Sequence, residues 1–443
     1  MRSTAAAIDD EVDCADGESE HLVVEIQKAT GLPASSSCFV ALCVSDHSGA
    51  LRGRRVCTSV RSQSGDPVWR CVRDLAVAPS HDDLLLVQLF TPDWCTCVGS
   101  TLVAASQLTL DVPLQLPLHR VLDPRTAGSL GSGFVTVCGR AWKEGEHRGR
   151  TLFLIRHGES RWNEAQKARR LGDMLALDHP LTRLGAQQSM SLREQWAAIQ
   201  NTLARDASVP YVDLLGLDER FGEESCADPA VGPDADVQWV EAFFAANFVA
   251  SSPLTRALQT ALLALRGHPA VDARGVTLLR CLREVKGSQG SLDSIGRAVG
   301  ADCRTRAELC LREALPESGV LVNDACAARV DATDAATPWW TPNDEADGEA
   351  AVAERVADLT SAVQFAPAGP VILVGHSLLF REVVRRCAGT ELTAALPDLT
   401  ARLVEGKLSN GGCLGLQVIF VGGRMRIVNA SLMFASTIVN RHD

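Results

Sequence analysis

Ionisable side chains follow four apolar runs of this sequence, at the points where the runs end. They are Arg156 and His157 after LFLI (152–155), Arg256 after NFVASSP (247–253), Glu284 at the end of VTLLRCLRE (276–284), and His376 after VILVG (371–375). If these runs are strands of one open α/β sheet, their carboxyl ends meet at a single crevice. Helices that start there would add backbone N–H donors for an anion. The sequence therefore predicts one anion-binding site that gathers these side chains.

The residue types at this predicted site suit phosphoryl transfer. A neutral imidazole at His157 can attack phosphorus and form a covalent phosphohistidine, which divides one difficult displacement into two. The transferring group spreads negative charge over its equatorial oxygens and needs fixed donors around it. Arg156 and Arg256 supply planar, permanently charged donors for this purpose. A phosphate that holds His376 protonated would gain a third cation.

The leaving oxygen needs a proton, and Glu284 is the candidate donor. A carboxyl group serves best as an acid near neutral pH when burial raises its pKa. The sequel KGSQGSLDSIG (286–296) contains Asp293, which is the reserve donor. This scheme requires no metal and no cofactor.

The C-terminal two-thirds of the chain has the rhythm of an α/β fold. From about residue 150, apolar runs such as TLFLI (151–155) and VILVG alternate with amphipathic stretches, which predicts a three-layer sheet with helices on both faces. The expected helices are 186–203, 253–266, 348–364 and 378–388. Residues 205–240 and 288–347 have weak periodicity and are expected to be insertions over the surface. In the second, Trp339 and Trp340 are expected to pack and not to stack on a substrate.

Several motifs in this part resemble those of the histidine phosphatase, or phosphoglycerate-mutase-like, superfamily. LFLIRHGESRWN (152–163) is similar to its LxRHGxxxxN signature, LTRLGAQQS (181–189) to LTxxGxxQA, SSPLTRALQTA (251–261) to SPLxRAxQTA, and VILVGHS (371–377) to the second-histidine strand. The resemblance covers residues 150–443. It implies His157 as the nucleophile, a phosphate pocket of Arg156, Arg256 and His376, Asn163 as a further phosphate contact, and Glu284 as the proton donor.

The departures from the family pattern decide between activities. Ser377 replaces the glycine or acid often found after the second histidine, and the mutase element LNExxYG is absent because VKGSQG follows Glu284. The expected activity is therefore a phosphatase that hydrolyses a phosphomonoester of a small molecule or a protein. The alternatives are a phosphoglycerate-type mutase and an inactive phosphate-sensing scaffold.

The first part of the chain has the pattern of an all-β unit. The β-rich runs 21–33, 38–44, 83–90 and 133–142 are separated by Gly, Pro, Ser and Asp, as in an antiparallel sandwich. Residues 21–143 resemble a C2 domain through LVVEIQKATGLP, GDPVWRCV and LLLVQLF…VGSTLV. The charged stretch 143–150 is the expected linker to the second domain.

The C2-like unit is expected to act without calcium, since that ion takes six to eight oxygen ligands. The first of the two relevant loops, ASSSCFV (34–40), has no carboxylate, and the second, FTPDWCTCVG (90–99), has Asp93 alone. The unit's partner is expected to be a membrane, another protein or the catalytic domain of the same chain. Membrane contact would use Trp94 and basic side chains such as Arg52, Arg54 and Arg55.

Composition excludes several other functions. The net charge of −11 argues against nucleic-acid binding, which needs a basic face. No apolar run is long enough to cross a bilayer. Residues 1–20 hold seven acids and one arginine, which predicts a disordered acidic tail instead of a signal peptide. The fifteen cysteines are scattered without a CxxC pair, so we expect reduced thiols in a cytoplasmic protein.

Overall fold

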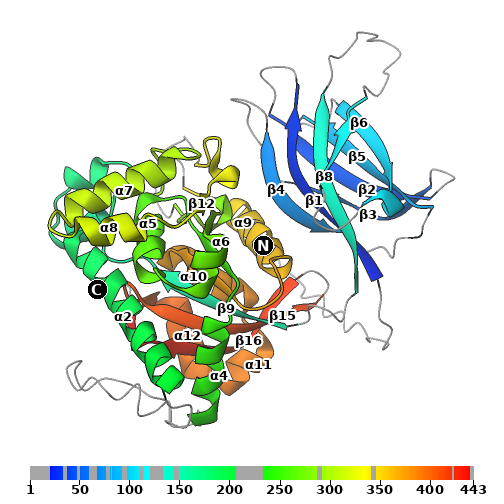
Figure 1. Cartoon of the computed structure of the whole chain (residues 1–443). Coiled ribbons are helices and arrows are strands. Elements are labelled where there is room, and N and C mark those ends of the chain that lie inside the picture. The colour runs from blue at the N-terminus through cyan, green and yellow to red at the C-terminus, as the bar shows by residue number, and fades with distance from the viewer. Residues whose placement is uncertain are drawn as a thin grey trace, which may run out of the picture.

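The computed structural model divides into an N-terminal region (residues 20–143) and a C-terminal region (149–439), which lie side by side (Figure 1). The structure describes residues 20–32, 37–46, 50–58, 67–75, 80, 82–91, 97–108, 113–119, 133–143, 149–205, 233–286, 292–340, 346–421 and 424–439. Of the predicted acidic tail, only Glu20 is described, and it is the first residue of a strand. The middle of the expected linker lies outside the described residues.

The described strands of the N-terminal region form two antiparallel sheets, with orders β4-β1-β8-β7 and β3-β2-β5-β6. The strands are β1 (Glu20–Thr30), β2 (Phe39–Ser45), β3 (Leu51–Cys57), β4 (Val68–Asp74), β5 (Leu84–Phe90), β6 (Cys97–Ala104), β7 (Leu114–Pro117) and β8 (Phe134–Lys143). The four β-rich runs predicted from the sequence are confirmed as β1, β2, β5 and β8.

Apolar alternation builds the core of this region. In β5, Leu85, Val87 and Leu89 are fully buried while the residues between them are partly exposed, as the two-residue period of a strand requires. Buried residues from both sheets, including Ile26 of β1 and Leu42 of β2, belong to one hydrophobic cluster. The two sheets therefore share a single core.

The C-terminal region is built on a mixed seven-stranded sheet of order β12-β11-β10-β13-β9-β15-β16. The first five strands in this order are parallel, and β15 and β16 run antiparallel at one edge. The strands are β9 (Gly149–Arg156), β10 (Phe248–Ser251), β11 (Val276–Leu278), β12 (Val330–Asp331), β13 (Val371–Gly375), β15 (Cys413–Val421) and β16 (Arg424–Met433). A separate antiparallel pair joins β14 (Lys407–Leu408) to β17 (Ile438–Val439).

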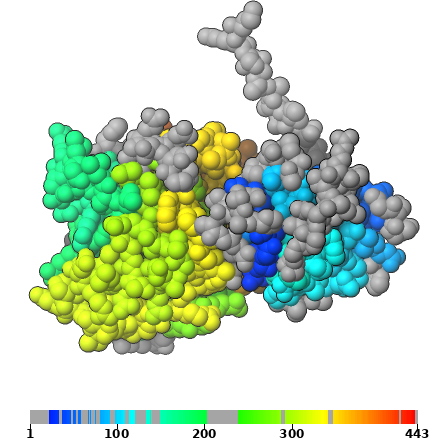
Figure 2. Space-filling view, turned by 90° about the horizontal axis from the view of Figure 1, so that it is seen from above, coloured from blue at the N-terminus to red at the C-terminus, as the bar shows by residue number. Residues whose placement is uncertain are grey.

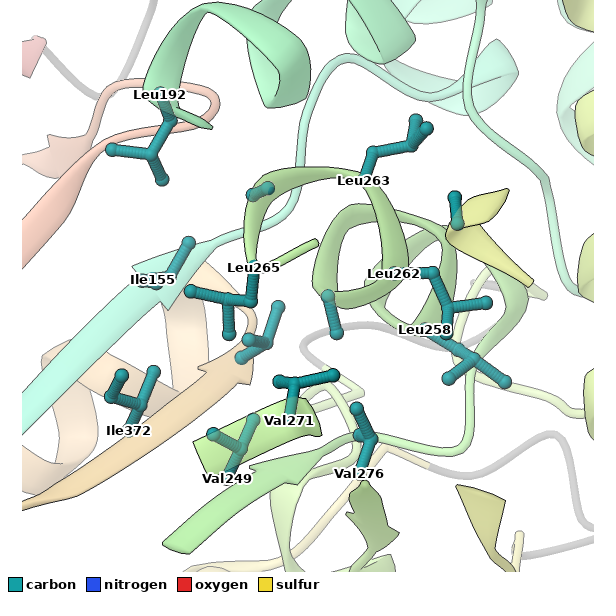
Figure 3. Close-up of a cluster of buried hydrophobic side chains, with 14 of the residues drawn as sticks. Ile155, Leu192, Val249, Leu258, Leu262, Leu263, Leu265, Val271, Val276 and Ile372 are labelled. Atoms are coloured by element: carbon teal, nitrogen blue, oxygen red, sulfur yellow. The ribbon is translucent and has the colours of Figure 1, made fainter. Parts of the chain in front are cut away.

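Helices cover both faces of this sheet, as the sequence predicts. Phe153 and Ile155 of β9 belong to one hydrophobic cluster and Leu152 and Leu154 to another, because successive strand residues point to opposite faces. The first cluster, part of which is shown in Figure 3, is completed by α2 (Arg183–Arg205), α4 (Pro233–Phe244), α5 (Thr255–Ala264), α6 (Pro269–Arg274), α7 (Asp302–Ala314) and α8 (Gly319–Ala325). The second is completed by α9 (Glu349–Gln364), α10 (Ser377–Cys387), α11 (Thr390–Ala395) and α12 (Pro397–Glu405). Among the described residues, no helix combines the length and the hydropathy that a bilayer crossing needs.

Two expectations need correction. The run 276–284 is not one strand: β11 ends at Leu278 and a 3-10 helix, η3 (Arg280–Leu282), follows. The backbone N–H of Arg280 donates to the Asp334 carboxylate (2.8 Å), so it is not available to a neighbouring strand. The expected insertion 288–347 is not only a surface layer, because β12 extends the sheet and Trp339 is buried in the first cluster. The packing expected of this tryptophan is confirmed; its indole N–H donates to Ala298 O at 3.0 Å.

Candidate active site

The carboxyl ends of the parallel strands β9, β13 and β10 lie together and are joined by backbone hydrogen bonds. The N–H of His157 donates to Gly375 O (3.0 Å), and that of Ser252 donates to Val374 O (2.9 Å). The rings of His157 and His376 lie with their centroids 5.0 Å apart. The convergence that the apolar runs predicted is therefore present for both histidines.

His157 is held in one tautomer. Its Nδ1 lies 2.7 Å from the carbonyl oxygen of Gly158, which can only accept, so Nδ1 is the protonated nitrogen. Nε2 is then the unprotonated nitrogen, and its lone pair accepts a hydrogen bond from Arg256 Nε at 3.3 Å. Burial lowers the pKa of His157 well below its usual value, and the charges of Arg256 and Arg156 lower it further. The site thus holds a neutral imidazole with Nε2 available to an electrophile.

Two buried arginines flank this imidazole. Arg256, in the first turn of α5, also donates to Asp293, from Nη1 to the backbone oxygen (2.7 Å) and from Nη2 to the carboxylate (3.5 Å). Arg156 donates from Nη1 to Leu408 O (2.6 Å), while its Nε is buried without a partner. Burial lowers the pKa of Arg156 to about 10, which leaves it charged at neutral pH. An unpaired N–H on a buried cation favours an anionic ligand.

His376 closes the site from the start of α10. Its Nε2 lies 2.9 Å from Ser252 Oγ, and its Nδ1 is buried without a partner. Burial, followed by the charge of Arg256, lowers the pKa of His376 well below its usual value. In the structure as it stands His376 is neutral, and the predicted third cation would form only with an anion bound.

Glu284 is a buried carboxyl group at the same strand ends. One oxygen, Oε1, accepts from the backbone N–H groups of Val285 (2.9 Å) and Leu379 (3.1 Å), the second of which belongs to the first turn of α10. Burial raises the pKa of Glu284 to about 6, and the negative charge of Asp293 adds to the rise. Asp293 itself forms an ion pair with Arg256 (3.5 Å). Burial makes Glu284 the candidate acid whose protonated form is favoured.

Asn163 occupies a position with a clear local role. It lies in the first turn of α1 (Arg161–Lys167), and its Oδ1 accepts from the N–H (3.1 Å) and the hydroxyl (2.9 Å) of Ser160. Since the Asn163 N–H donates back to Ser160 Oγ, the pair forms a capping box. These bonds use only the amide oxygen, so the predicted phosphate contact of its Nδ2 group stays a prediction.

Two glycines set the path of the turn after the nucleophile. A Cβ at Gly158 would lie 2.2 Å from Gly185 O, and one at Gly185 would lie 2.0 Å from Glu159 O. Thr260 of α5 accepts from the Gly158 N–H at 3.0 Å. The segments 156–158 and 181–185 therefore pack directly against each other through backbone atoms.

Sequence reasoning missed two residues beside Arg256. Asp178, buried and at a φ of 50°, accepts from the Thr255 N–H (2.8 Å) and hydroxyl (2.6 Å) and fixes the start of α5. His179 is buried with an unpartnered Nε2, and burial followed by the charge of Arg256 lowers its pKa. Neither residue follows a predicted strand, so the strand-end pattern could not reveal them. Among the described residues there is no group of three or more His, Cys, Asp or Glu side chains that could hold a metal.

Comparisons with known proteins add similarities at low identity. No model of a known protein family matches the chain, and neither does any curated protein. Among solved structures, a C2 domain of plant extended synaptotagmin 1 is 16% identical, with 28% of this chain and 98% of that one covered and a TM-score of 0.23. Human GIVD cytosolic phospholipase A2 is 16% identical, with 29% and 17% covered and a TM-score of 0.23. A structure named mycobacterial hydrolase 2 is 17% identical, with 67% and 94% covered and a TM-score of 0.31.

Proposed function

We propose that residues 150–443 form a histidine phosphatase that hydrolyses a phosphomonoester through a phosphohistidine at His157. The observation that carries the proposal is the state of that residue: a neutral imidazole with Nδ1–H bound to Gly158 O and an unprotonated Nε2 beside buried arginines, which would exchange its hydrogen bond from Arg256 for the bond to phosphorus. A nucleophile needs an available lone pair, and an anionic phosphoryl group needs nearby cations. Both requirements are met at Nε2.

The first step forms an Nε2–P bond as the P–O bond to the alcohol breaks. Glu284 gives its proton to the leaving oxygen and becomes a carboxylate. A pKa of about 6 supports this role, because much of the carboxyl group is then protonated near neutral pH. The imidazolium phosphate is stabilised by Arg156, Arg256 and the protonated form of His376.

The second step returns the site to its starting state. Water attacks phosphorus, the Glu284 carboxylate takes a proton from it, and the Nε2–P bond breaks. The products are inorganic phosphate and neutral His157. Each side chain of the site is thereby regenerated, and no step involves a metal.

Phosphate release by the purified full-length chain tests the proposal. A panel of alkyl, aryl, sugar and peptide phosphates should include esters that yield inorganic phosphate, with unchanged rates in excess chelator. Rapid acid-free quenching with labelled ester should trap label on His157, located by peptide mapping. Transfer between two oxygens of one substrate without release would identify a mutase. Absence of both release and labelled His157 across the panel would leave a phosphate-sensing scaffold.

We also propose that residues 21–143 are a C2-like unit that acts without calcium in a cytoplasmic protein. Its two antiparallel sheets around one core support this fold. The loop residues Asp93 and Trp94 lie outside the described residues, so the calcium argument rests on sequence composition alone.

A further inference from the structure

The edge strand β4 of the N-terminal region lies against the C-terminal region. It contacts α9 and the 3-10 helix η4 (Thr333–Ala335), and Figure 1 shows it beside α9. Arg73 of β4 forms an ion pair with Asp358 of α9 (Nη2 to Oδ1, 2.8 Å) and donates from Nε to Cys57 O (2.9 Å). Its guanidinium is therefore bound on both sides of the junction. In Figure 2 the blue and cyan atoms of this region abut the yellow part of the C-terminal region.

Helix α9, whose Asp358 pairs with Arg73, also binds the backbone of Glu284, the proposed proton donor. Arg355, one turn before Asp358 in α9, is almost fully buried and donates from Nη1 to Glu284 O (3.2 Å) and Arg283 O (3.4 Å). Its Nη2 donates to Asp347 (2.7 Å). The backbone of Glu284 is thus attached directly to α9.

Asp347 binds residues on both sides of Glu284 in the sequence. It accepts from the Lys286 N–H at 2.8 Å and from Arg283 Nη2 at 3.2 Å. These contacts, together with those of Arg355, fix both sides of Glu284. A displacement of α9 would consequently reach the carboxyl group through its own backbone.

The second element that β4 contacts holds the start of the same segment. Asp334 of η4 accepts from the backbone N–H of Arg280 (2.8 Å) and from its Nε (3.0 Å). The two elements against which β4 docks therefore both bind the segment 280–286.

The ion pair between Arg73 and Asp358 is largely shielded from solvent, with 15% and 16% of the two side chains exposed. Proton transfer is sensitive to small displacements, and a shift of about 1 Å at a catalytic group can cost about 100-fold in rate. The contacts of α9 therefore connect this ion pair to the position of the proposed proton donor.

We propose that the N-terminal region positions the proton donor: docking of β4 fixes α9 and η4, which in turn fix segment 280–286 and Glu284. Arg73 is then a positioning residue of the phosphatase, although it lies in the other region. This inference rests on the proposed function. It assigns the N-terminal region an intramolecular partner, the α9–η4 face of the C-terminal region.

The test compares two esters in the full-length chain carrying Arg73→Ala, Asp358→Asn or the exchange Arg73→Asp with Asp358→Arg. We expect the single variants to lower kcat/KM about 5-fold or more for an alkyl phosphate and less than about 2-fold for p-nitrophenyl phosphate, whose leaving group needs no proton. The exchange should restore much of the alkyl rate. Arg52→Ala is the matched control, since it breaks an ion pair with Asp83 that lies within the N-terminal region.

Hydrogen exchange gives a readout that is independent of catalysis. The N–H groups of Val285 and Leu379 bind Glu284 Oε1, so they should exchange faster in Arg73→Ala and not in Arg52→Ala. Equal slowing of both esters, no slowing of either, or unchanged exchange would overturn the inference while leaving an active wild type as a phosphatase. A wild type that releases no phosphate would defeat the proposed function, and the exchange measurement would still decide the coupling.

Discussion

The two regions of the molecule differ in how many ionisable side chains they bury. Among the described residues of the N-terminal region, Asp83 is the one buried side chain that is an acid, a lysine, an arginine or a histidine, and it is paired with Arg52. The C-terminal region buries many more: Arg150, Arg156, His157, Glu159, Asp178, His179, Arg256, His268, Arg280, Glu284, Lys286, Asp293, Asp334, Arg355 and His376.

The N-terminal region is held together mainly by its apolar core, whereas the C-terminal region also contains a candidate functional site with buried ionisable side chains. Burying an ionisable group costs several kcal/mol unless partners compensate it. Most of the buried groups in the C-terminal region have such partners, but Arg156, His179 and His376 each keep a buried nitrogen without one. Unpartnered polar atoms and shifted pKa values that gather at strand ends are typical of a functional site.

Substitution of the proposed nucleophile should have the largest effect, and it tests directly whether the C-terminal region holds an active site. His157→Ala should lower phosphate release at least about 1,000-fold, since the proposed covalent intermediate forms on Nε2 of this residue. The acid-labile phosphoprotein should also disappear, as measured with labelled ester. His268→Ala is the matched control, because this buried histidine serves the core through Phe243 O (3.0 Å) and should lower Tm while turnover persists. Substantial turnover by His157→Ala would remove the mechanism.

The proton donor should produce a smaller and selective effect. Glu284→Gln keeps the shape of the side chain but cannot give a proton, so alkyl phosphates should slow about 100-fold. An activated aryl phosphate should slow far less, because its leaving group departs unprotonated. Asp293→Asn should slow both esters alike, since the Asp293 carboxylate accepts from Arg256 Nη2 (3.5 Å) and its charge is lost. Selective slowing by Asp293→Asn and not by Glu284→Gln would exchange their roles.

The pH dependence should follow Glu284. Its pKa of about 6 means that the acid form dominates below that pH and is lost above it. The ratio of alkyl to aryl rates should therefore be flat at low pH and fall about tenfold per unit well above pH 6. Each rate should first be corrected for the second ionisation of its own phosphate, which differs between alkyl and aryl esters. A ratio that stays constant from pH 5 to about 8 would contradict the assignment of the acid.

Calcium should have the smallest effect of all. Binding of the full-length chain to anionic vesicles should be the same with calcium and with chelator, because Asp93 is the one acid in the two loop sequences. Any binding that does occur should weaken with salt. Vesicle sedimentation measures both. A calcium-dependent shift into the pellet would show that the N-terminal region also holds a charged site.

Sequence patterns predicted best where one physical signal dominates. The run 371–375 is the whole of β13, because a central strand buried on both faces is apolar throughout. The helix expected over 348–364 is observed as Glu349–Gln364, since its apolar residues keep the helical period. The strand ends of β9 and β13 then brought His157 and His376 together as expected.

Prediction was weaker where a contact from elsewhere in the chain decides the local structure. VTLLRCLRE is apolar enough to be one strand, but Asp334 binds the Arg280 N–H and β11 ends at Leu278. The hydrogen bond from Arg355 to the backbone oxygen of Glu284 likewise joins residues 71 positions apart, and no local sequence pattern reveals it. The capping box of Ser160 and Asn163 did have a local signal, a serine three residues before a polar helix residue.

The contact between Gly158 and Gly185 has a consequence for redesign of the pocket. The obstacle to a Cβ at either position is backbone, so no repacking of neighbouring side chains relieves it. A library that varies both motifs should lose nearly every clone with a side chain at either position, irrespective of polarity. Sequence variation must therefore be introduced at other positions, such as Leu171 and Leu175, whose side chains are exposed.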